Sequence, residues 1–300
     1  MTNLKAELSS EAIDSNKLVG SKPTAGLQKG KFNSHGLTVR FRHARLQDGV
    51  NALILDFNEL AARQLRDYRN VNPGTCFANP DFELSIASAY QLQDAVAGLR
   101  IKEGDAVAGY KIGCIGEDIK SQFGIEGPIR GTIFRSEIFS DDLKLSADSF
   151  CNLAVEAEMV FTIGDKGQIE NTFPVIELHN LIFRAEKKNL SELIANNGIH
   201  AGLVMPHNKF INTYQQSERA CEISLQINDS IFSTNQVWPI KESPSGSLDW
   251  LREHAMSHTF NVSAGNIVLA GTTLGIYPVK TGDKIAVFLD GQAMVTCSVG

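Results

Sequence analysis

Two glutamates separated by one residue inside a long apolar run constrain this chain more than any other feature. The segment from Ala154 to Ile163 reads AVEAEMVFTI, and its only charges are Glu156 and Glu158. Successive side chains of a β-strand point to opposite faces, so the two carboxylates would share one face and leave the other apolar. Their Cβ atoms would lie roughly 6.5 to 7 Å apart. Two glutamate side chains can reach one hard cation from that separation.

The next apolar segment adds a third carboxylate. Pro174 to His179 reads PVIELH, which we interpret as a short strand that begins at the proline and carries Glu177. Three glutamates on two neighbouring strands form the oxygen-rich ligand set that Mg²⁺ or Mn²⁺ prefers. The alternative is a solvated, charged strand face. His179 would share the face of Glu177, either as an acid, a base or a fourth contact, or as a packed structural histidine.

A single cation interrupts the apolar strand expected from Val107 to Ile115. Lys111 stands in its middle, with glycines at positions 109, 113 and 116. This glycine spacing matches neither the dinucleotide-binding fingerprint nor the phosphate-binding P-loop, so the segment does not indicate a nucleotide site. A lysine at such a position either extends to the surface or lies over an anionic site.

The charge and cysteine content exclude several classes of protein. The 300-residue chain has a net charge of −6 without a basic stripe, which argues against nucleic acid or an anionic membrane as the partner. Its five cysteines are scattered and form no Cys-x-x-Cys pair, so neither a disulfide framework nor a zinc site is indicated. No run approaches the roughly 18 apolar residues of a membrane span. We expect a cytoplasmic enzyme of a small molecule.

The periodicity of the apolar residues predicts a mixed architecture. Residues 1–50 are expected to be a polar, flexible N-terminal extension, and residues 51–300 a single catalytic domain. Within that domain, three- and four-residue apolar steps predict helices over 52–68 and 86–99, in a helical part of about 51–105. A β-rich, metal-binding part of about 106–300 follows. Strands and helices do not alternate regularly, so the fold class is α+β rather than a doubly wound parallel sheet.

Short motifs spread from about residue 52 to the C-terminus resemble those of one known family. They are AYQLQ at 89–93, GYKIG at 109–113, VEAE at 155–158, PVIE at 174–177, ANN at 195–197, WL at 250–251 and the glycine-rich ending from Gly265 to Asp283. In order and spacing they resemble the fumarylacetoacetate hydrolase superfamily, in the branch of 2-keto-4-pentenoate hydratases and 4-oxalocrotonate decarboxylases. The resemblance implies a mixed β-sandwich or roll with flanking helices, assembled as a homo-oligomer.

The same resemblance implies a site and a reaction. The metal ligands would be Glu156, Glu158 and Glu177, holding Mg²⁺ or Mn²⁺, and Lys111 would lie beside a small 2-oxo acid substrate. We also expect catalysis to involve His179, and substrate contacts from Asn180 and Gly271. The implied activity is that of a lyase in aromatic compound catabolism, which adds water to 2-hydroxypenta-2,4-dienoate and gives 4-hydroxy-2-oxopentanoate.

The chain departs from the family pattern around this site. The family often has Glu-x-x-Asp-Ser-Arg after the third ligand, whereas Glu177 is followed here by LHNLI. The usual Ala-Asp-Asn is ANN, with Asn196 for the aspartate, and the aspartate of a Pro-Asp-x-Gly turn is Ile129. Because Ile129 cannot transfer protons, decarboxylation of a 4-oxalocrotonate-type acid is a second hypothesis. Hydrolysis of a carbon–carbon bond in an acylpyruvate, and a non-catalytic metal-binding role, also stay open.

Overall fold

The computed structural model describes residues 57–116, 127–207, 222–258 and 260–300, with a few residues between these ranges and two strands before them. The chain divides into two compact units, Met1–Asp56 and Phe57–Gly300. In the first unit, β1 (Arg42–Arg45) pairs antiparallel with β2 (Asn51–Ile54). The other residues of the expected extension lie outside the described residues. The prediction of a helix from residue 52 was wrong at its start, because Asn51–Ile54 pair with β1 and the helix begins at Phe57.

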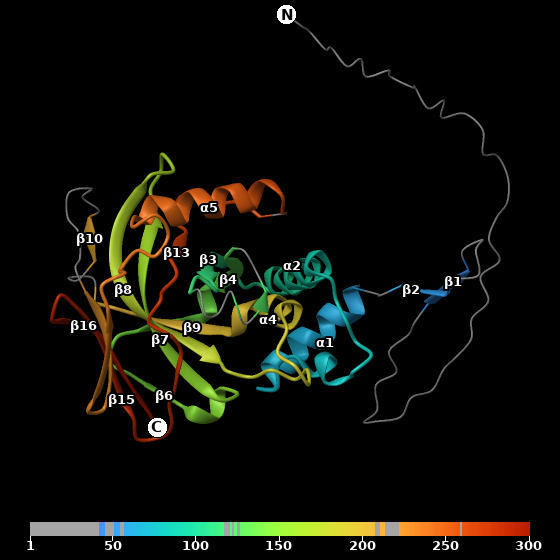
Figure 1. Cartoon of the computed structure of the whole chain (residues 1–300), viewed down its shortest axis with the longest axis horizontal. Helices are drawn as coiled ribbons and strands as arrows, with labels where there is room; N and C mark the ends of the chain where they lie inside the picture. The colour runs from blue at the N-terminus through green and yellow to red at the C-terminus, as the bar shows by residue number, and fades with distance from the viewer. Residues whose placement is uncertain are drawn as a thin grey trace, which may run out of the picture. The chain divides into compact units, whose positions relative to one another are not determined.

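The described strands of the larger unit form two sheets (Figure 1). The nine-stranded sheet has the order β4-β3-β13-β7-β8-β9-β5, with β10 beside β8 and β14 beside β7. Its strands are β3 (Val107–Gly113), β4 (Ile129–Phe134), β5 (Ile138–Ser140), β7 (Leu153–Ile163), β8 (Ile169–Asn180), β9 (His200–Met205), β10 (Asn212–Thr213), β13 (Ile267–Leu269) and β14 (Tyr277–Pro278). The five-stranded sheet has the order β12-β11-β15-β16-β6. Its strands are β6 (Leu143–Leu145), β11 (Ile223–Ile227), β12 (Ser230–Thr234), β15 (Lys284–Leu289) and β16 (Gln292–Val299).

The two sheets pack face to face through the apolar face of the Glu-x-Glu strand. Val155 and Ala157 of β7 are fully buried against residues of β11, β15 and β16, including Leu225 and Val287. Burying one such aliphatic side chain stabilises the fold by about 1.5–3 kcal/mol. The intervening glutamates therefore point away from this sandwich core, as alternation along a strand requires.

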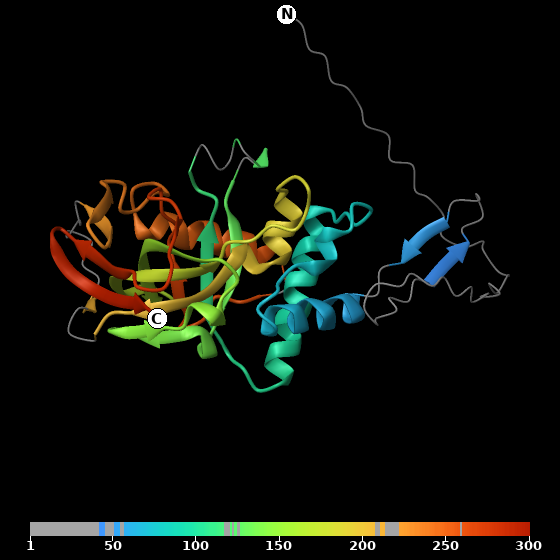
Figure 2. The ribbon, with the colours of Figure 1, turned by 90° about the horizontal axis from the view of Figure 1, so that it is seen from below.

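Helices flank the nine-stranded sheet (Figures 1 and 2). They are α1 (Phe57–Arg69), α2 (Ile86–Lys102), α4 (Leu190–Ala195) and α5 (Pro244–Met256), with single 3₁₀ turns η1 (Thr75–Ala78), η2 (Arg135–Glu137), η3 (Ala147–Ser149) and η4 (Asn197–Ile199). Leu248 and Leu251 of α5 pack on β3, β7 and β13, while α1, α2 and α4 share a separate apolar cluster. No helix in the described part of the chain is long and apolar enough to cross a membrane. The predicted α+β class with curved sheets and flanking helices is confirmed.

Pro174 lies inside a strand and does not begin one. The strand β8 starts at Ile169 and pairs along its whole length with β7. On its other side, pairing with β10 ends at Thr172 and pairing with β9 begins at Ile176. Pro174 therefore falls in the gap between two partner strands, where the missing N–H costs no ladder hydrogen bond.

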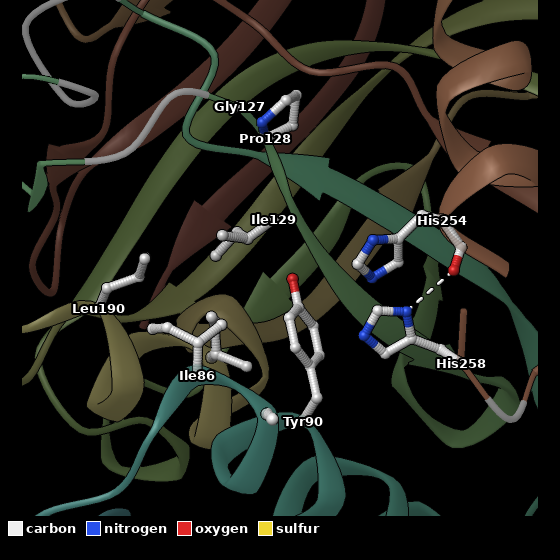
Figure 3. Close-up of a pocket in the computed structure, with 10 residues that line it drawn as sticks. Ile86, Tyr90, Gly127, Pro128, Ile129, Leu190, His254 and His258 are labelled. Atoms are coloured by element: carbon white, nitrogen blue, oxygen red, sulfur yellow. Dashed lines mark hydrogen bonds between the residues drawn. The ribbon is translucent and has the colours of Figure 1, made fainter. Parts of the chain in front are cut away.

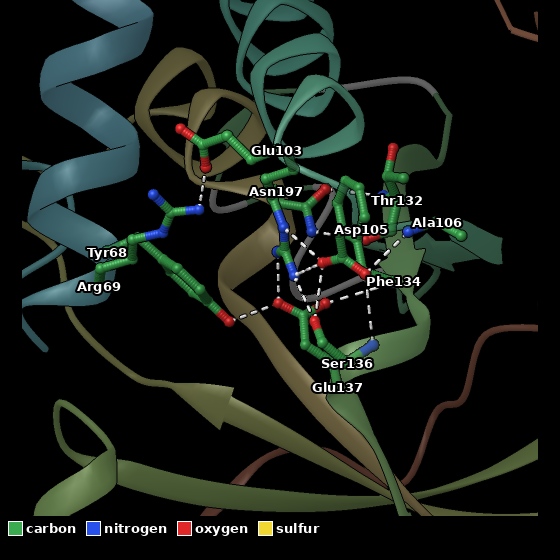
Figure 4. Close-up of polar contacts among 11 residues, drawn as sticks. Tyr68, Arg69, Glu103, Asp105, Ala106, Thr132, Phe134, Ser136, Glu137 and Asn197 are labelled. Atoms are coloured by element: carbon green, nitrogen blue, oxygen red, sulfur yellow. Dashed lines mark hydrogen bonds and ion pairs between the residues drawn. The ribbon is translucent and has the colours of Figure 1, made fainter.

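A buried ion-pair network fixes the helices against the sheet beside β4 (Figure 4). Arg100 of α2 contacts Glu137 of η2 at 2.5 Å and Asp105 at 2.7 Å. The hydroxyl of Tyr68 in α1 donates to the same Glu137 carboxylate at 2.6 Å. Since Arg100 and Glu137 are both buried, losing either partner would leave an uncompensated charge. The network thus holds α1 and α2 in place beside β4.

Candidate metal centre and active site

Three glutamates meet on the face of the large sheet that points away from the sandwich core. Glu156 of β7 lies directly opposite Glu177 of β8, and Glu158 lies opposite Val175. Glu158 and Glu177 are 1% and 0% exposed, and Glu156 is partly buried. The strand alternation predicted from the sequence therefore brings these carboxylates together in a largely dry site.

Sheet register places Lys111 on the same face. Lys111 of β3 is paired with Leu269 of β13, which is paired with Val160 of β7, two residues beyond Glu158. Its Nζ atom lies 2.7 Å from Glu177 Oε1 and 3.3 Å from the Gly198 carbonyl oxygen, to which it donates. The residue is 4% exposed. Lys111 therefore lies over an anionic site and does not extend to the surface.

A glycine opposite Lys111 makes room for its side chain. Gly131 of β4 is the cross-strand partner of Lys111. A Cβ atom on Gly131 would lie 2.7 Å from Lys111 Cγ and 2.8 Å from the Asn197 carbonyl oxygen. The absence of a side chain at this position therefore leaves space for the aliphatic part of the Lys111 side chain.

Two histidines, His179 and His200, complete the cluster, and the sequence predicted only His179. His179 Nε2 lies 3.3 Å from Glu156 Oε2 and 3.5 Å from Glu177 Oε2. His200 Nδ1 lies 2.7 Å from Glu177 Oε1. An irregularity in the β8–β9 pairing between Leu178 and His179 sets His200 opposite His179. A β-bulge changes the direction of side chains in this way. No local pattern in the sequence predicted this irregularity.

The buried carboxylates have opposite pKa shifts. Burial alone would raise the pKa of Glu177, but Lys111, His179 and His200 hold it well below the ordinary value. The pKa of Glu158 is raised well above the ordinary value by burial and by the neighbouring carboxylates. Burial would lower the pKa of Lys111, and the three glutamates raise it instead. The site therefore retains the Lys111–Glu177 ion pair and disfavours a further negative charge.

The donor atoms of the cluster fit a divalent cation. Glu156, Glu177 and His179 offer ligand atoms that all lie within 4.8 Å of one another. Glu177 Oε2 and His179 Nε2 are buried without a hydrogen-bond partner among the described residues. Buried polar atoms normally have a partner, and carboxylate with imidazole is a common donor set for divalent metals. With all three glutamates ionised, the positive charge of Lys111 leaves a net charge of −2, which such a cation would neutralise.

Two other expected site residues occupy different positions. Gly271 follows β13 with φ at +89°, and its N–H donates to Glu158 Oε1 at 2.5 Å, so it belongs to the cluster. This bond holds Glu158 at one side of the ligand group, and its role as a ligand stays a prediction. Asn180 alternates to the opposite strand face from Glu177 and His179, and its Oδ1 accepts the Cys151 N–H at 2.7 Å. The structure does not bring Asn180 to the carboxylates.

Motif residues with amide side chains hold the segments around Lys111. Asn197 exchanges two hydrogen bonds with the backbone of Thr132, at 2.6 and 2.7 Å. Gln93 of α2 donates to the carbonyl oxygens of Arg130 and Ile194, at 3.1 and 2.7 Å. These bonds connect α2, β4, α4 and η4 around Lys111.

A cavity of about 380 Å³ lies at the edge strand β4 (Figure 3). It is lined by Ile86, Ala87, Tyr90, Gly127, Pro128, Ile129, Leu190, Ile194, His254 and His258. Ile129, which takes the place of the family's aspartate, is 3% exposed and forms part of this lining. The histidines come from α5 and the residues after it, and sequence analysis did not associate them with the site.

Comparisons with known proteins agree with the motifs and the fold. No model of a known protein family matches the sequence. The chain is 22% identical over 233 residues to 2-oxo-hept-4-ene-1,7-dioate hydratase of Escherichia coli, covering 72% of this chain and 87% of that protein. It is 26% identical over 223 residues to 2-keto-4-pentenoate hydratase 1 of Dechloromonas aromatica, covering 70% and 84%.

A solved structure shares the fold over most of its length. The 4-oxalocrotonate decarboxylase of Pseudomonas putida G7, complexed with magnesium and adipate, superimposes with a TM-score of 0.71 at 18% identity. The match covers 81% of this chain and 97% of the decarboxylase. The chain is therefore similar in sequence to 2-keto-4-pentenoate hydratases and 4-oxalocrotonate decarboxylases, and it has the fold of the decarboxylase.

Proposed function

We propose that this protein is a divalent-metal-dependent lyase of short unsaturated 2-oxo acids. Its proposed reaction is the hydration of 2-hydroxypenta-2,4-dienoate to 4-hydroxy-2-oxopentanoate. The observation that carries the proposal is the buried cluster in which Lys111 and His179 contact the paired carboxylates Glu156 and Glu177. The hydratases among its relatives and the magnesium in the related decarboxylase support the same reading. We also propose a homo-oligomer, as the family resemblance implies.

Glu156, Glu177 and His179 would hold the cation, with Glu158 as a further carboxylate beside them. A bound Mg²⁺ or Mn²⁺ would supply Lewis-acid chemistry to the 1-carboxylate and 2-oxo oxygens of the substrate. His200 orients Glu177 through its 2.7 Å contact, in the manner of a residue that supports a metal ligand.

Lys111 provides fixed positive charge next to the reacting end of the substrate. Its ammonium group is buried, and its 2.7 Å contact with Glu177 holds it in place. In a site with little water, such a charge stabilises negative charge that develops on a neighbouring oxygen more strongly than it would in solution. We therefore assign Lys111 the stabilisation of the enolate-like oxygen during the reaction.

Proton transfer at the far end of the diene requires another group, since Ile129 carries no proton. The net reaction moves the proton of the 2-hydroxyl group away, adds one at C5, and then adds the hydroxyl and a proton of water at C4 and C3. Tyr90 and His254 line the cavity that also contains Ile129 (Figure 3). We propose that these two polar side chains transfer the protons in the steps at C5 and C4.

Decarboxylation of a 4-oxalocrotonate-type acid is the second candidate, and the position of Ile129 favours it. An apolar side chain near the substrate lowers the polarity around a departing carboxylate, which favours loss of CO₂. The charge of Lys111 would serve this reaction equally well, because both reactions build negative charge on the 2-oxo group.

The test is an assay of purified protein with Mg²⁺ or Mn²⁺ against both substrates. Hydration is followed as loss of the ultraviolet absorbance of 2-hydroxypenta-2,4-dienoate, and decarboxylation as CO₂ release from 4-oxalocrotonate. The proposal predicts hydration that is lost in Glu177→Gln. CO₂ release without hydration would reverse the order of the two candidates. Metal binding without turnover of either acid or of an acylpyruvate would show a non-catalytic member of the family.

A further inference from the structure

The cavity beside β4 is apolar over most of its lining. Six of its described lining residues have aliphatic or proline side chains: Ile86, Ala87, Pro128, Ile129, Leu190 and Ile194. They come from α2, α4 and the start of β4, three segments brought together by the α2–α4 cluster. This open pocket of about 380 Å³ accommodates a short carbon chain, and contact with its apolar lining removes part of that chain from water.

Ile129 places the cavity next to the candidate metal centre. Ile129 and Lys111 belong to paired strands, and their cross-strand partners are Gly113 and Gly131 respectively. Both side chains lie next to Gly113. A Cβ atom added to Gly113 would be 3.7 Å from Ile129 Cγ1 and 3.9 Å from Lys111 Nζ. Ile129 Cδ1 and Lys111 Nζ lie 3.7 Å and 3.6 Å from the equivalent point on Gly198. A substrate whose head is at Lys111 would thus have its tail at Ile129.

The described polar groups that line the cavity carry no fixed positive charge. Those among the described lining residues are the Tyr90 hydroxyl and the imidazoles of His254 and His258. His254 Nε2 is buried without a hydrogen-bond partner in the described residues, and the two imidazole rings stack at 3.9 Å. The nearby guanidinium of Arg130 is already paired with Asp94 at 2.6 Å.

A second carboxylate would have no ionic partner among the described lining residues. The ring of His254 stacks on that of His258, and burial together with His258 and Arg130 lowers the pKa of His254 to about 4. A carboxylate in contact with this lining would lose part of its hydration without gaining an ionic partner among the described residues, whereas methylene groups would gain from the same contact.

We infer that this cavity is the subsite for the far end of the substrate and that it selects 2-oxo acids with an uncharged, apolar tail over those that end in a second carboxylate. This inference rests on the proposed function, because the metal centre must hold the 2-oxo acid head. It narrows the substrate class, since the relatives include an enzyme named for a 1,7-dioate and enzymes named for pentenoates.

Binding of unreactive 2-oxo acids tests the inference without turnover. Calorimetry in the presence of Mg²⁺ would compare 2-oxohexanoate with 2-oxoadipate, which share six carbons and the same head and differ in the terminal methyl or carboxylate. We expect at least about tenfold tighter binding of 2-oxohexanoate. From 2-oxobutanoate to 2-oxohexanoate, each added methylene should tighten binding about fourfold.

Variants at the cavity rim test whether this cavity is responsible. Ile86 is 43% exposed in the first turn of α2, so Ile86→Arg should fold and place a cation at the cavity mouth. It should reduce the preference for 2-oxohexanoate about tenfold. The matched control is Ile101→Arg, because Ile101 is 50% exposed near the other end of the same helix and outside the cavity. Ala87→Phe, also at the rim, should weaken binding of 2-oxohexanoate and leave pyruvate binding unchanged.

The outcomes separate the inference from the proposed function. Equal or tighter binding of 2-oxoadipate by the parent protein would overturn the inference alone. The inference alone would also be overturned if Ile86→Arg and Ile101→Arg preferred 2-oxohexanoate over 2-oxoadipate to the same extent. Failure of pyruvate and every longer 2-oxo acid to bind would overturn the proposed function and the inference with it.

Discussion

Replacing Lys111 by Met removes the buried ammonium group that contacts Glu177 and retains most of the side-chain volume. Glu177 is fully buried, and after the substitution its neighbours within the described cluster are His179, His200 and the other glutamates. The substitution therefore leaves a buried carboxylate with weaker compensation, and three carboxylates without a fixed positive charge among them.

The expected loss of stability follows from the burial of this ion pair. Breaking a buried pair by removing one partner costs about 3–5 kcal/mol, and the retained contact with His200 favours the lower value, about 3 kcal/mol. For a folded unit of this size the midpoint of thermal unfolding should fall by roughly 6–12 °C. A divalent cation would replace the missing charge, so the difference should shrink when Mg²⁺ is added. Turnover should fall by about 10²- to 10³-fold even with Mg²⁺ present, because the metal does not replace the charge at the substrate.

Thermal unfolding of parent and variant, in EDTA and in excess Mg²⁺, measures both effects. Lys284→Met is the matched control, since Lys284 is an exposed lysine on β15. If Lys111→Met in EDTA unfolds at the same temperature as Lys284→Met, the ion pair does not have the stability assigned to it. A midpoint difference that Mg²⁺ does not reduce would contradict a cation at this cluster.

Three further predictions address the metal, the reaction and the imidazole stack. Glu158→Gln should weaken Mg²⁺ binding severely in calorimetry, because it removes the carboxylate that lies beside Glu156, Glu177 and His179. Ile129→Asp should raise hydration relative to CO₂ release in the paired substrate assay, since it restores a proton-transferring group at the cavity. The pKa of His254 is lowered from 6.5 to about 4 by burial and by His258 and Arg130, so the unfolded chain binds this proton more readily. Its contribution to stability is complete above about pH 6.5 and is lost as the pH falls toward 4. Denaturant titrations of the parent and of His254→Phe at pH 7 and 4.5 should detect this loss. The change in unfolding free energy between the two pH values should differ between the two proteins by about 1–2 kcal/mol, a value that allows for the partial solvent exposure of His254.

Matched variants define what would contradict these predictions. Glu170→Gln removes an exposed carboxylate from β8 and should leave Mg²⁺ affinity unchanged. Equal affinity of Glu158→Gln and Glu170→Gln would exclude Glu158 from the metal site. An Ile129→Asp variant with an unchanged ratio of hydration to CO₂ release would show that this position does not govern the reaction. Parallel pH profiles of parent and His254→Phe would exclude the depressed pKa.

Local periodicity was sufficient to predict the strand bearing Glu156 and Glu158, and the face on which both lie. A period of two follows from the geometry of a single strand, and no distant contact is needed to establish it. The same holds for α2, whose predicted start at Ile86 agrees with the structure and whose preceding Ser85 accepts the Ser88 N–H. The motifs also predicted the similarity to hydratases and decarboxylases that the comparisons found, because their order along the chain is independent of how the chain folds.

The tertiary structure decided which residues meet these strands. His200 contacts Glu177 because an irregularity between β8 and β9 re-aims it, and a bulge depends on how two strands pair. The helix expected from residue 52 begins at Phe57, because pairing with β1 overrides the helical period of the preceding residues. Ile129 and His254 line one cavity although 125 positions separate them in sequence, since α5 folds back over β3 and β13. Such contacts arise from packing between elements, which side-chain periodicity within one element does not specify.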